Sequence, residues 1–193
     1  MSFAISPKHT SEQFDHPPNL DEKIEIFIAR VQGWQIQPAL DMQSHSIAHR
    51  GFAQLLIVIS FFEMVGKYRA GFIGEGRSAK YFKEGLHWTF PEIDERDMQI
   101  LDSFYTSIRN GLYHMGLTRP NVIIIDAIPG SFGFNEEHQA LAISPDRFVE
   151  DINIRFCAYA EELRNPANTA LRDAFEKRFD DDSLWKPIKR DAA

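Results

Sequence analysis

The first long pattern in the chain is a set of apolar side chains at helical spacing. In residues 19–41 they recur every three or four positions: Ile24, Phe27, Ile28, Val31 and Trp34. This spacing predicts an amphipathic helix. Asn19 or Asp21 can cap its start, and Pro38 is expected to bend or end it.

Residues 45–69 are apolar on nearly all sides of a predicted second helix. Such a helix lies at the centre of a bundle or is shared with another subunit. A third helix is predicted over residues 92–113. Between the two, Gly71, Gly74 and Gly76 interrupt the pattern. We therefore expect residues 71–92 to form a long connection with a short helix at residues 78–84.

The hydrophobic period changes after the third helix. Residues 121–126 contain three consecutive isoleucines and predict a strand, because β-branched side chains fit a pleated surface. Pro129 and Gly130 predict a turn. Residues 131–134 and 139–143 predict a second and a third strand. Together these segments indicate a β-hairpin or small meander.

The remainder of the chain returns to helical spacing. Pro145 suits the first position of a fourth long helix over residues 145–164. Asn168 or Thr169 caps a last helix that runs to about residue 179. The predicted fold is a mainly α bundle of four or five long helices. The small β-hairpin or meander is inserted near residues 121–143, between the third and fourth helices.

The whole chain, residues 1–193, is predicted to be one helical domain. We expect residues 1–18 to be a flexible arm, residues 19–179 the bundle, and residues 180–193 a tail. Forty-four per cent of the residues are hydrophobic, enough for a sizeable core. The 16 phenylalanines are a heavy aromatic load, and part of it can serve a subunit interface. A homodimer is therefore expected.

Charge and cysteine content narrow the class of protein. The net charge of −7 argues against indiscriminate nucleic-acid binding. The only cysteine, Cys157, excludes an internal disulfide, fits a reducing compartment and is expected in the core. No secretion signal is recognisable, and the apolar run of residues 55–62 is far shorter than the roughly 20 residues of a membrane span. These features predict a soluble cytoplasmic protein without a membrane partner.

The candidate chemistry lies at the end of the third predicted helix. The sequence there is Arg109-Asn110-Gly111-Leu112-Tyr113-His114. Arginine binds phosphate, and histidine transfers protons near neutral pH. Asn110 and His114 are four residues apart and share a helix face, whereas Arg109 and His114 do not. An arginine and a histidine can promote phosphodiester cleavage without a metal.

This motif resembles that of the HEPN domain family, in which arginine, a polar residue and histidine follow the Arg-polar-x-x-x-His pattern. The apolar helix that contains Glu63 resembles the second helix of that family. The resemblance covers roughly residues 20–165, and only the short motif is specific. It implies a metal-independent endoribonuclease of the toxin or phage-defence type, with no cofactor. It also implies a homodimer that acts on RNA and an antitoxin protein as a partner.

The resemblance assigns a role to each motif residue. His114 takes the proton of the 2′-hydroxyl or protonates the leaving oxygen, Arg109 stabilises charge on the phosphate, and Asn110 positions the scissile group. Without the resemblance, Arg109 and His114 also fit an ion pair and a helix cap. A second hypothesis is a non-catalytic HEPN-like module that binds a nucleotide or a protein, or dimerises.

Further candidate binding residues lie outside the motif. Glu63 either forms an ion pair with Lys67 at i+4 or faces Arg109 or His114. The 71–92 connection interleaves basic and aromatic residues, a combination that suits single-stranded nucleic acid. The candidate substrate-binding residues are Glu63, Arg77, Lys80 and Tyr113.

A metal site is not expected. His45 and His49 have the i, i+4 spacing of a helical metal pair, but no acidic residue or cysteine lies near them in sequence.

Overall fold

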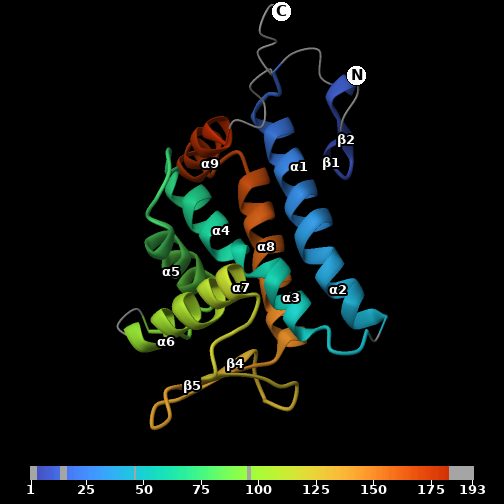
Figure 1. The fold of residues 1–193 in the computed structure, drawn as a ribbon. Coiled ribbons are helices and arrows are strands. Elements are labelled where there is room, and N and C mark those ends of the chain that lie inside the picture. The colour runs from blue at the N-terminus through green and yellow to red at the C-terminus, as the bar shows by residue number, and fades with distance from the viewer. Residues whose placement is uncertain (1–3, 14–16, 46, 95–96, 183–193) are drawn as a thin grey trace, which may run out of the picture.

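The computed structural model describes residues 4–13, 17–45, 47–94 and 97–182. Most of these residues are helical, and a small sheet lies at one end of the bundle, below the helices in Figure 1. The mainly helical fold with a small β insertion is thus as predicted. The predicted tail lies mostly outside the described residues.

The first predicted helix is present but longer than expected. α1 (Leu20–Val31) begins with a capping box in which Asn19 and Glu22 bond each other's backbone N–H. A π-helical segment (Gln32–Ile36) leads directly into α2 (Gln37–Ser44). Pro38 therefore neither ends the helix nor breaks it sharply. It is the second residue of α2, just after the π-helical segment, and the helix continues through it.

α3 (Gly51–Val58) and α4 (Ser60–Ala70) correspond to the second predicted helix. Their inner face is completely buried, which confirms a central position: Leu55, Val58, Phe61, Phe62 and Val65. The outer face of α3 is not covered, since Phe52 and Leu56 are exposed. By length and composition alone, the run Gly51–Ala70 could cross a membrane. Half of that run is buried inside the protein, and no other helix of the described residues passes the same test.

The prediction for residues 71–92 was wrong in its helix length. α5 (Ser78–Thr89) has 12 residues and packs along α4. A Cβ built on Gly66 would lie 2.1 Å from the carbonyl oxygen of Tyr81, and one on Gly85 would lie 1.9 Å from that of Phe62. Gly85 therefore permits a close crossing of two helices and does not interrupt the helix.

The motif-bearing helix is shorter and less regular than predicted. α6 (Met98–Ser103) begins after the N-cap Asp97, whose side chain accepts from the Ile100 N–H. A π-helical segment (Phe104–Arg109) continues into α7 (Asn110–Met115), which ends at Gly116 with φ of 70°. A Cβ on Gly111 would lie 2.6 Å from the carbonyl oxygen of Leu117. Gly111 therefore lets the chain fold back against α7.

The three strands after the motif exist, but their order is not that of a meander. β3 (Val122–Ile124), β4 (Phe132–Asn135) and β5 (Ala140–Ile143) pair in the order β3-β5-β4. β4 and β5 form an antiparallel hairpin, and β3 lies parallel to β5. The turn at Pro129 and Gly130 therefore carries the chain past the position of β5, and no hairpin joins β3 to β4.

α8 (Pro145–Arg164) and α9 (Thr169–Asp181) agree with the last two predicted helices. The predicted flexible arm is partly ordered: β1 (Ala4–Ser6) pairs with β2 (His9–Thr10). Ile5 is buried, and its carbonyl oxygen accepts a hydrogen bond from Arg30 Nε at 2.5 Å. A buried side chain and a helix contact anchor this segment.

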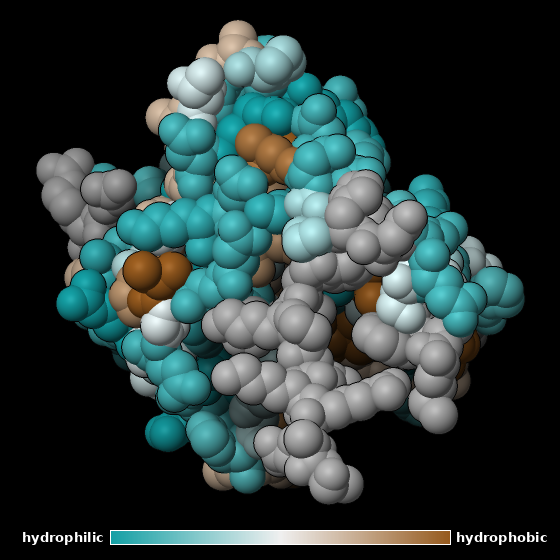
Figure 2. Space-filling model, turned by 90° about the horizontal axis from the view of Figure 1, so that it is seen from above, coloured by the Kyte–Doolittle hydropathy of each residue, from teal (hydrophilic) through white to brown (hydrophobic). Residues whose placement is uncertain are grey.

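The core is rich in aromatic rings. Phe62 contacts the rings of Phe82, Phe90 and Phe148, and Phe148 stacks on Phe104. Most of the aromatic load is therefore internal. The prediction that Cys157 lies in the core was wrong, because its side chain is exposed. Figure 2 views the molecule from above, and the side chains seen there are mostly hydrophilic, with small separate hydrophobic areas.

Candidate functional site

Arg109 ends the π-helical segment that precedes α7, and its guanidinium faces α4. Its Nη2 lies 3.1 Å from Glu63 Oε2, and its Nη1 donates to Asn110 Oδ1 at 3.0 Å. The rings of Tyr105 and Tyr113, one turn before and after it, lie 5.5 and 5.0 Å from its guanidinium carbon. Two polar partners and two rings thus hold the arginine in place.

Glu63 forms both of the interactions that the sequence left open, the ion pair with Lys67 and the contact with Arg109. Its Oε1 accepts from Lys67 Nζ at 2.7 Å and from Ser78 Oγ at 2.7 Å, while Oε2 pairs with Arg109. Burial by itself would raise the pKa of Glu63. The bonds from Lys67 and Ser78 and the charges of Lys67 and Arg109 outweigh burial and hold this pKa below its ordinary value. The carboxylate is therefore ionised at neutral pH.

Two cations share this one carboxylate. Lys67 and Arg109 form no other salt bridge within the described residues. The side chains of Glu63, Lys67 and Arg109 are 17%, 14% and 21% exposed, so solvent screens them incompletely. One positive charge is left over at this point of the surface, which favours a nearby anion.

The shared carboxylate lies in the wall of a cavity of about 370 Å³. The residues around it come from α4, the start of α7 and the end of α9: Ser60, Glu63, Met64, Lys67, Tyr68, Arg109, Tyr113, Arg178 and Asp182. We call it the Arg109 cavity. At its α9 end, the Tyr68 hydroxyl donates to Asp182 Oδ2 at 2.6 Å, and Arg178 pairs with Asp182.

His114 does not line the Arg109 cavity. It is exposed in the last turn of α7, and Asn110 bonds Arg109 rather than the imidazole. Its neighbours Tyr113, Met115 and Leu117 are 49%, 60% and 60% exposed. The imidazole is therefore exposed outside the cavity, whereas the arginine lies beside it. The expected separation of the two side chains around the helix is found.

The other basic candidates lie apart from the cavity. Arg77, with φ of 55°, precedes α5 and lies 5.7 Å from the Phe72 ring. Lys80 is 3.6 Å from Glu84 on the same helix, and both are exposed. Neither Arg77 nor Lys80 lines the Arg109 cavity. Only Ser78, which the sequence did not suggest, links α5 to Glu63.

Trp88, in the predicted connection, is not presented to a ligand. The guanidinium carbons of Arg69 and Arg155 lie 4.6 and 5.1 Å from its ring centre, and the Tyr159 ring is 5.7 Å away. Its ring is thus already packed between side chains. No group of His, Cys, Asp and Glu that could hold a metal occurs among the described residues, and His45 Nδ1 is engaged with the carbonyl of Asp41 at 2.8 Å.

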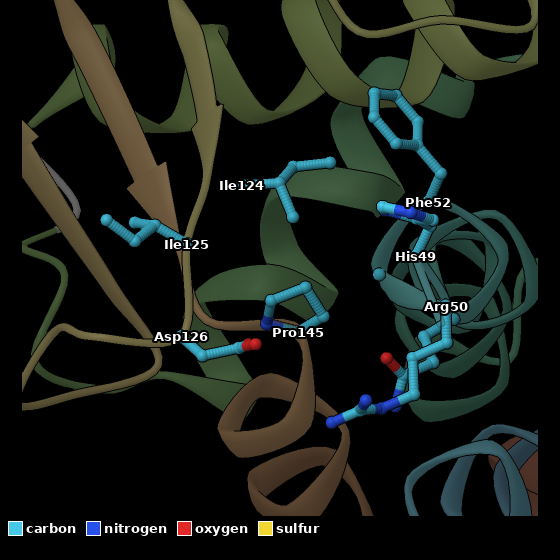
Figure 3. Close-up of a pocket in the computed structure, with 9 residues that line it drawn as sticks. His49, Arg50, Phe52, Ile124, Ile125, Asp126 and Pro145 are labelled. Atoms are coloured by element: carbon cyan, nitrogen blue, oxygen red, sulfur yellow. The ribbon is translucent and has the colours of Figure 1, made fainter. Parts of the chain in front are cut away.

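A second cavity, of about 320 Å³, was not predicted. It lies where the start of α3, the end of β3 and the start of α8 meet (Figure 3). The residues around it are His49, Arg50, Gly51, Phe52, Gln54, Ile124, Ile125, Asp126 and Pro145. We call it the Arg50 cavity, because Arg50 forms an ion pair there with Asp146. Gln54, a polar residue inside an apolar run, was the one signal of it in the sequence.

Comparison with protein-family models, with curated proteins and with solved structures finds no match for this chain.

Proposed function

We propose that the protein is a HEPN-like, metal-independent endoribonuclease of the toxin or phage-defence type. The observation that carries the proposal is the pair of cations, Arg109 and Lys67, that share the single carboxylate of Glu63 at the edge of a cavity. A phosphate group compensates the remaining positive charge there. Five residues after Arg109, the exposed His114 supplies an imidazole, a side chain that can accept and donate protons.

The proposed reaction uses the 2′-hydroxyl of the RNA as the nucleophile. One His114 takes the proton of this hydroxyl, and the 2′-oxygen forms a bond to the adjacent phosphorus. The bond from phosphorus to the 5′-oxygen breaks, and this leaving oxygen takes a proton from a second imidazole. Arg109 stabilises the charge on the phosphate oxygens, and Asn110 holds Arg109 in position. The products are a 2′,3′-cyclic phosphate and a 5′-hydroxyl.

A homodimer completes this site in the proposal. Acid and base must lie on opposite sides of the phosphorus, and each chain has one His114 in the motif. The exposed side chains of Tyr113, Met115 and Leu117 beside it support a contact with a second copy. We propose that this contact brings two His114 side chains to one phosphate, in a HEPN-like arrangement of the bundle.

One observation favours the second candidate, a HEPN-like module that binds without catalysis. The guanidinium of Arg109 is already bonded to Glu63 and Asn110 before any ligand is present. An arginine held in this way can bind an anion without taking part in a reaction. In this alternative the Arg109 cavity holds a nucleotide or an acidic segment of a partner protein such as an antitoxin.

Cleavage of a pool of single-stranded and structured RNAs, with and without EDTA, tests the proposal. We expect His114→Ala to lower the rate about 10²- to 10⁴-fold, because the proton carrier is lost. Arg109→Ala should lower both rate and RNA affinity. EDTA should change nothing.

The matched controls are His138→Ala and Arg119→Ala, which remove an exposed histidine and an exposed arginine outside the Arg109 cavity. Both should cleave like the wild type. Cleavage that survives His114→Ala and Arg109→Ala would refute the ribonuclease site. An absence of cleavage, together with nucleotide binding that Arg109→Ala abolishes, would support the binding module instead.

Light scattering tests the dimer independently of catalysis. At micromolar concentration we expect twice the 22.2 kDa of one chain. Leu117→Glu places a charge in the proposed contact and should give monomers. The matched control is Ile154→Glu, which changes another strongly exposed apolar residue, on α8. A wild-type protein that stays monomeric would exclude the two-imidazole mechanism.

A further inference from the structure

We propose that the Arg50 cavity binds a guanine base, presented by a guanine nucleotide. The cavity is separate from the motif and shares no residue with the Arg109 cavity. Its volume of about 320 Å³ is at the small end of the range for small-molecule sites. The inference does not depend on ribonuclease activity.

A buried acceptor without a partner is the first indication of a ligand. The Gln54 side chain is completely buried. Its Nε2 donates to the Ala39 carbonyl at 3.2 Å and to Asp146 Oδ1 at 2.9 Å. Both partners are acceptors, so the orientation of the amide is fixed. Its Oε1 has no partner among the described residues, and a buried carbonyl in this state is costly unless a donor reaches it.

A second acceptor lies at the rim. The carboxylate of Asp126 forms no hydrogen bond or ion pair with the described residues, and Figure 3 shows it directed toward Pro145. The charge of Asp126 acts on Arg50, which places the two side chains near one another. Asp126 and Gln54 therefore offer oxygen atoms to a ligand that carries N–H or O–H donors.

The charge around the cavity decides between a cation and a neutral donor. Asp126 and Asp146 bring two negative charges and Arg50 one positive charge. α3 and α8 both begin at this cavity without a side-chain cap. Each helix N-terminus contributes roughly half a positive charge. The surroundings are therefore close to neutral, and neither a metal ion nor an ammonium group is favoured. The ligand group that fits is neutral and rich in N–H donors.

Apolar side chains form part of the wall. Ile124 and Pro145 lie beside one another and Phe52 lies on the α3 side, whereas Ile125 points away from them (Figure 3). Gly51 leaves room at the edge of the cavity, since a Cβ there would lie 2.9 Å from both Ile124 and Pro145. Among nucleobases, guanine presents two adjacent N–H groups that a carboxylate can accept side by side. Adenine carries a ring nitrogen that is an acceptor beside its amino group. This nitrogen would face the Asp126 carboxylate, which is also an acceptor.

Titration calorimetry with GMP and AMP tests the inference on the full chain. We expect GMP to bind and AMP to bind at least about tenfold more weakly, because one charge-assisted hydrogen bond is worth about 1.5–3 kcal/mol. Asp126→Asn retains the shape of the side chain and should weaken GMP about 10- to 100-fold. Glu137→Gln makes the same charge change on the β4–β5 hairpin and should leave binding unchanged.

Backbone NMR signals locate the ligand. GMP should shift the amide signals of Gly51 and Asp126 and leave those of Lys67 and Tyr113 in place. No binding of GMP up to roughly 5 mM, equal binding of AMP, or shifts confined to the Arg109 cavity would overturn the proposal.

Discussion

Each of the two cavities contains an arginine paired with a carboxylate, but the groups left unpaired differ. The Arg109 cavity has an extra cation, and the Arg50 cavity has extra hydrogen-bond acceptors. At the Arg109 cavity, two cations share Glu63. At the Arg50 cavity, Asp146 accepts from both Arg50 and Gln54, while the Asp126 carboxylate and Gln54 Oε1 accept no hydrogen bond from the described residues. The first arrangement is short of an acceptor, and the second is short of a donor. An ion pair thus indicates a ligand only through the groups around it that stay unpaired.

The difference also concerns how each cavity is supported. The Arg109 cavity depends on α4, on the helix that carries Arg109 and Tyr113, and on the end of α9, while Ser78 of α5 bonds Glu63 from outside the lining. The Arg50 cavity depends on α3, β3 and α8. Substitutions can therefore disturb one cavity and leave the other intact.

The largest effect is expected at the crossing of α4 and α5. Gly66→Ala would place a Cβ 2.1 Å from the carbonyl oxygen of Tyr81, and backbone cannot move aside as a side chain does. We expect a loss of about 3 kcal/mol or more in the free energy of unfolding. Urea unfolding measures it. Gly133→Ala, where nothing lies within 4 Å, is the control and should change stability by less than about 0.5 kcal/mol. Equal stability of both variants would contradict the close crossing.

Removal of the shared carboxylate is expected to have the next largest effect. Glu63→Ala leaves Lys67 and Arg109 as neighbouring, partly buried cations without a counterion. We expect a loss of about 2–3 kcal/mol in urea unfolding, below the 3–5 kcal/mol of a fully buried pair. The matched control, Glu84→Ala, removes an exposed helical partner of Lys80 and should cost less than about 0.5 kcal/mol. Similar losses in the two variants would mean that Glu63 is not central to the Arg109 cavity.

The Arg50 cavity should respond to acid. Burial alone would raise the pKa of Asp146, but bonds from Arg50 and Gln54 and the charge of Arg50 hold it below the ordinary value. A depressed pKa contributes stability above the unfolded pKa of about 4, and this contribution is lost as the pH falls through the folded value. Asp146→Asn should therefore be less stable than the wild type at pH 7, by less than Glu63→Ala. The urea midpoints of the two proteins should approach one another as the pH falls below about 4, and a constant gap would contradict this account.

Local sequence patterns predicted much of the fold. α1, α8 and α9 follow from apolar spacing and caps, and the β-branched run at residues 122–125 predicted β3. α5 extends five residues beyond the predicted helix, through Gly85, whose missing side chain permits the contact with Phe62. The order β3-β5-β4 depends on pairing between Val122 and Leu141, which no local signal contains.

The candidate sites show the same limit. The ion pair of Glu63 with Lys67 was predicted from helical spacing and the contact with Arg109 from an acid placed in the most apolar helix, and both are found. Helical spacing also separated Arg109 from His114, but it could not predict the cavity beside Arg109, which α4 and the end of α9 complete. The Arg50 cavity was missed because Arg50 and Asp146 are 96 positions apart. Spacing identifies residues on one helix, but only packing brings distant helix starts together.

The smallest effect on stability is expected at Tyr113, and it separates ligand binding from folding. The ring is 49% exposed and lies 5.0 Å from the guanidinium carbon of Arg109. An exposed contact of this kind is worth about 0.5–1 kcal/mol. Tyr113→Leu should therefore lower the free energy of unfolding by less than about 1 kcal/mol. Base stacking on an aromatic ring contributes about 1–3 kcal/mol, so RNA affinity should fall about fivefold or more. Ile154→Leu, at an exposed apolar residue of α8 outside the Arg109 cavity and the proposed dimer contact, should change neither quantity. If Tyr113→Leu instead lost stability and kept its RNA affinity, the ring would serve only to hold Arg109 in place.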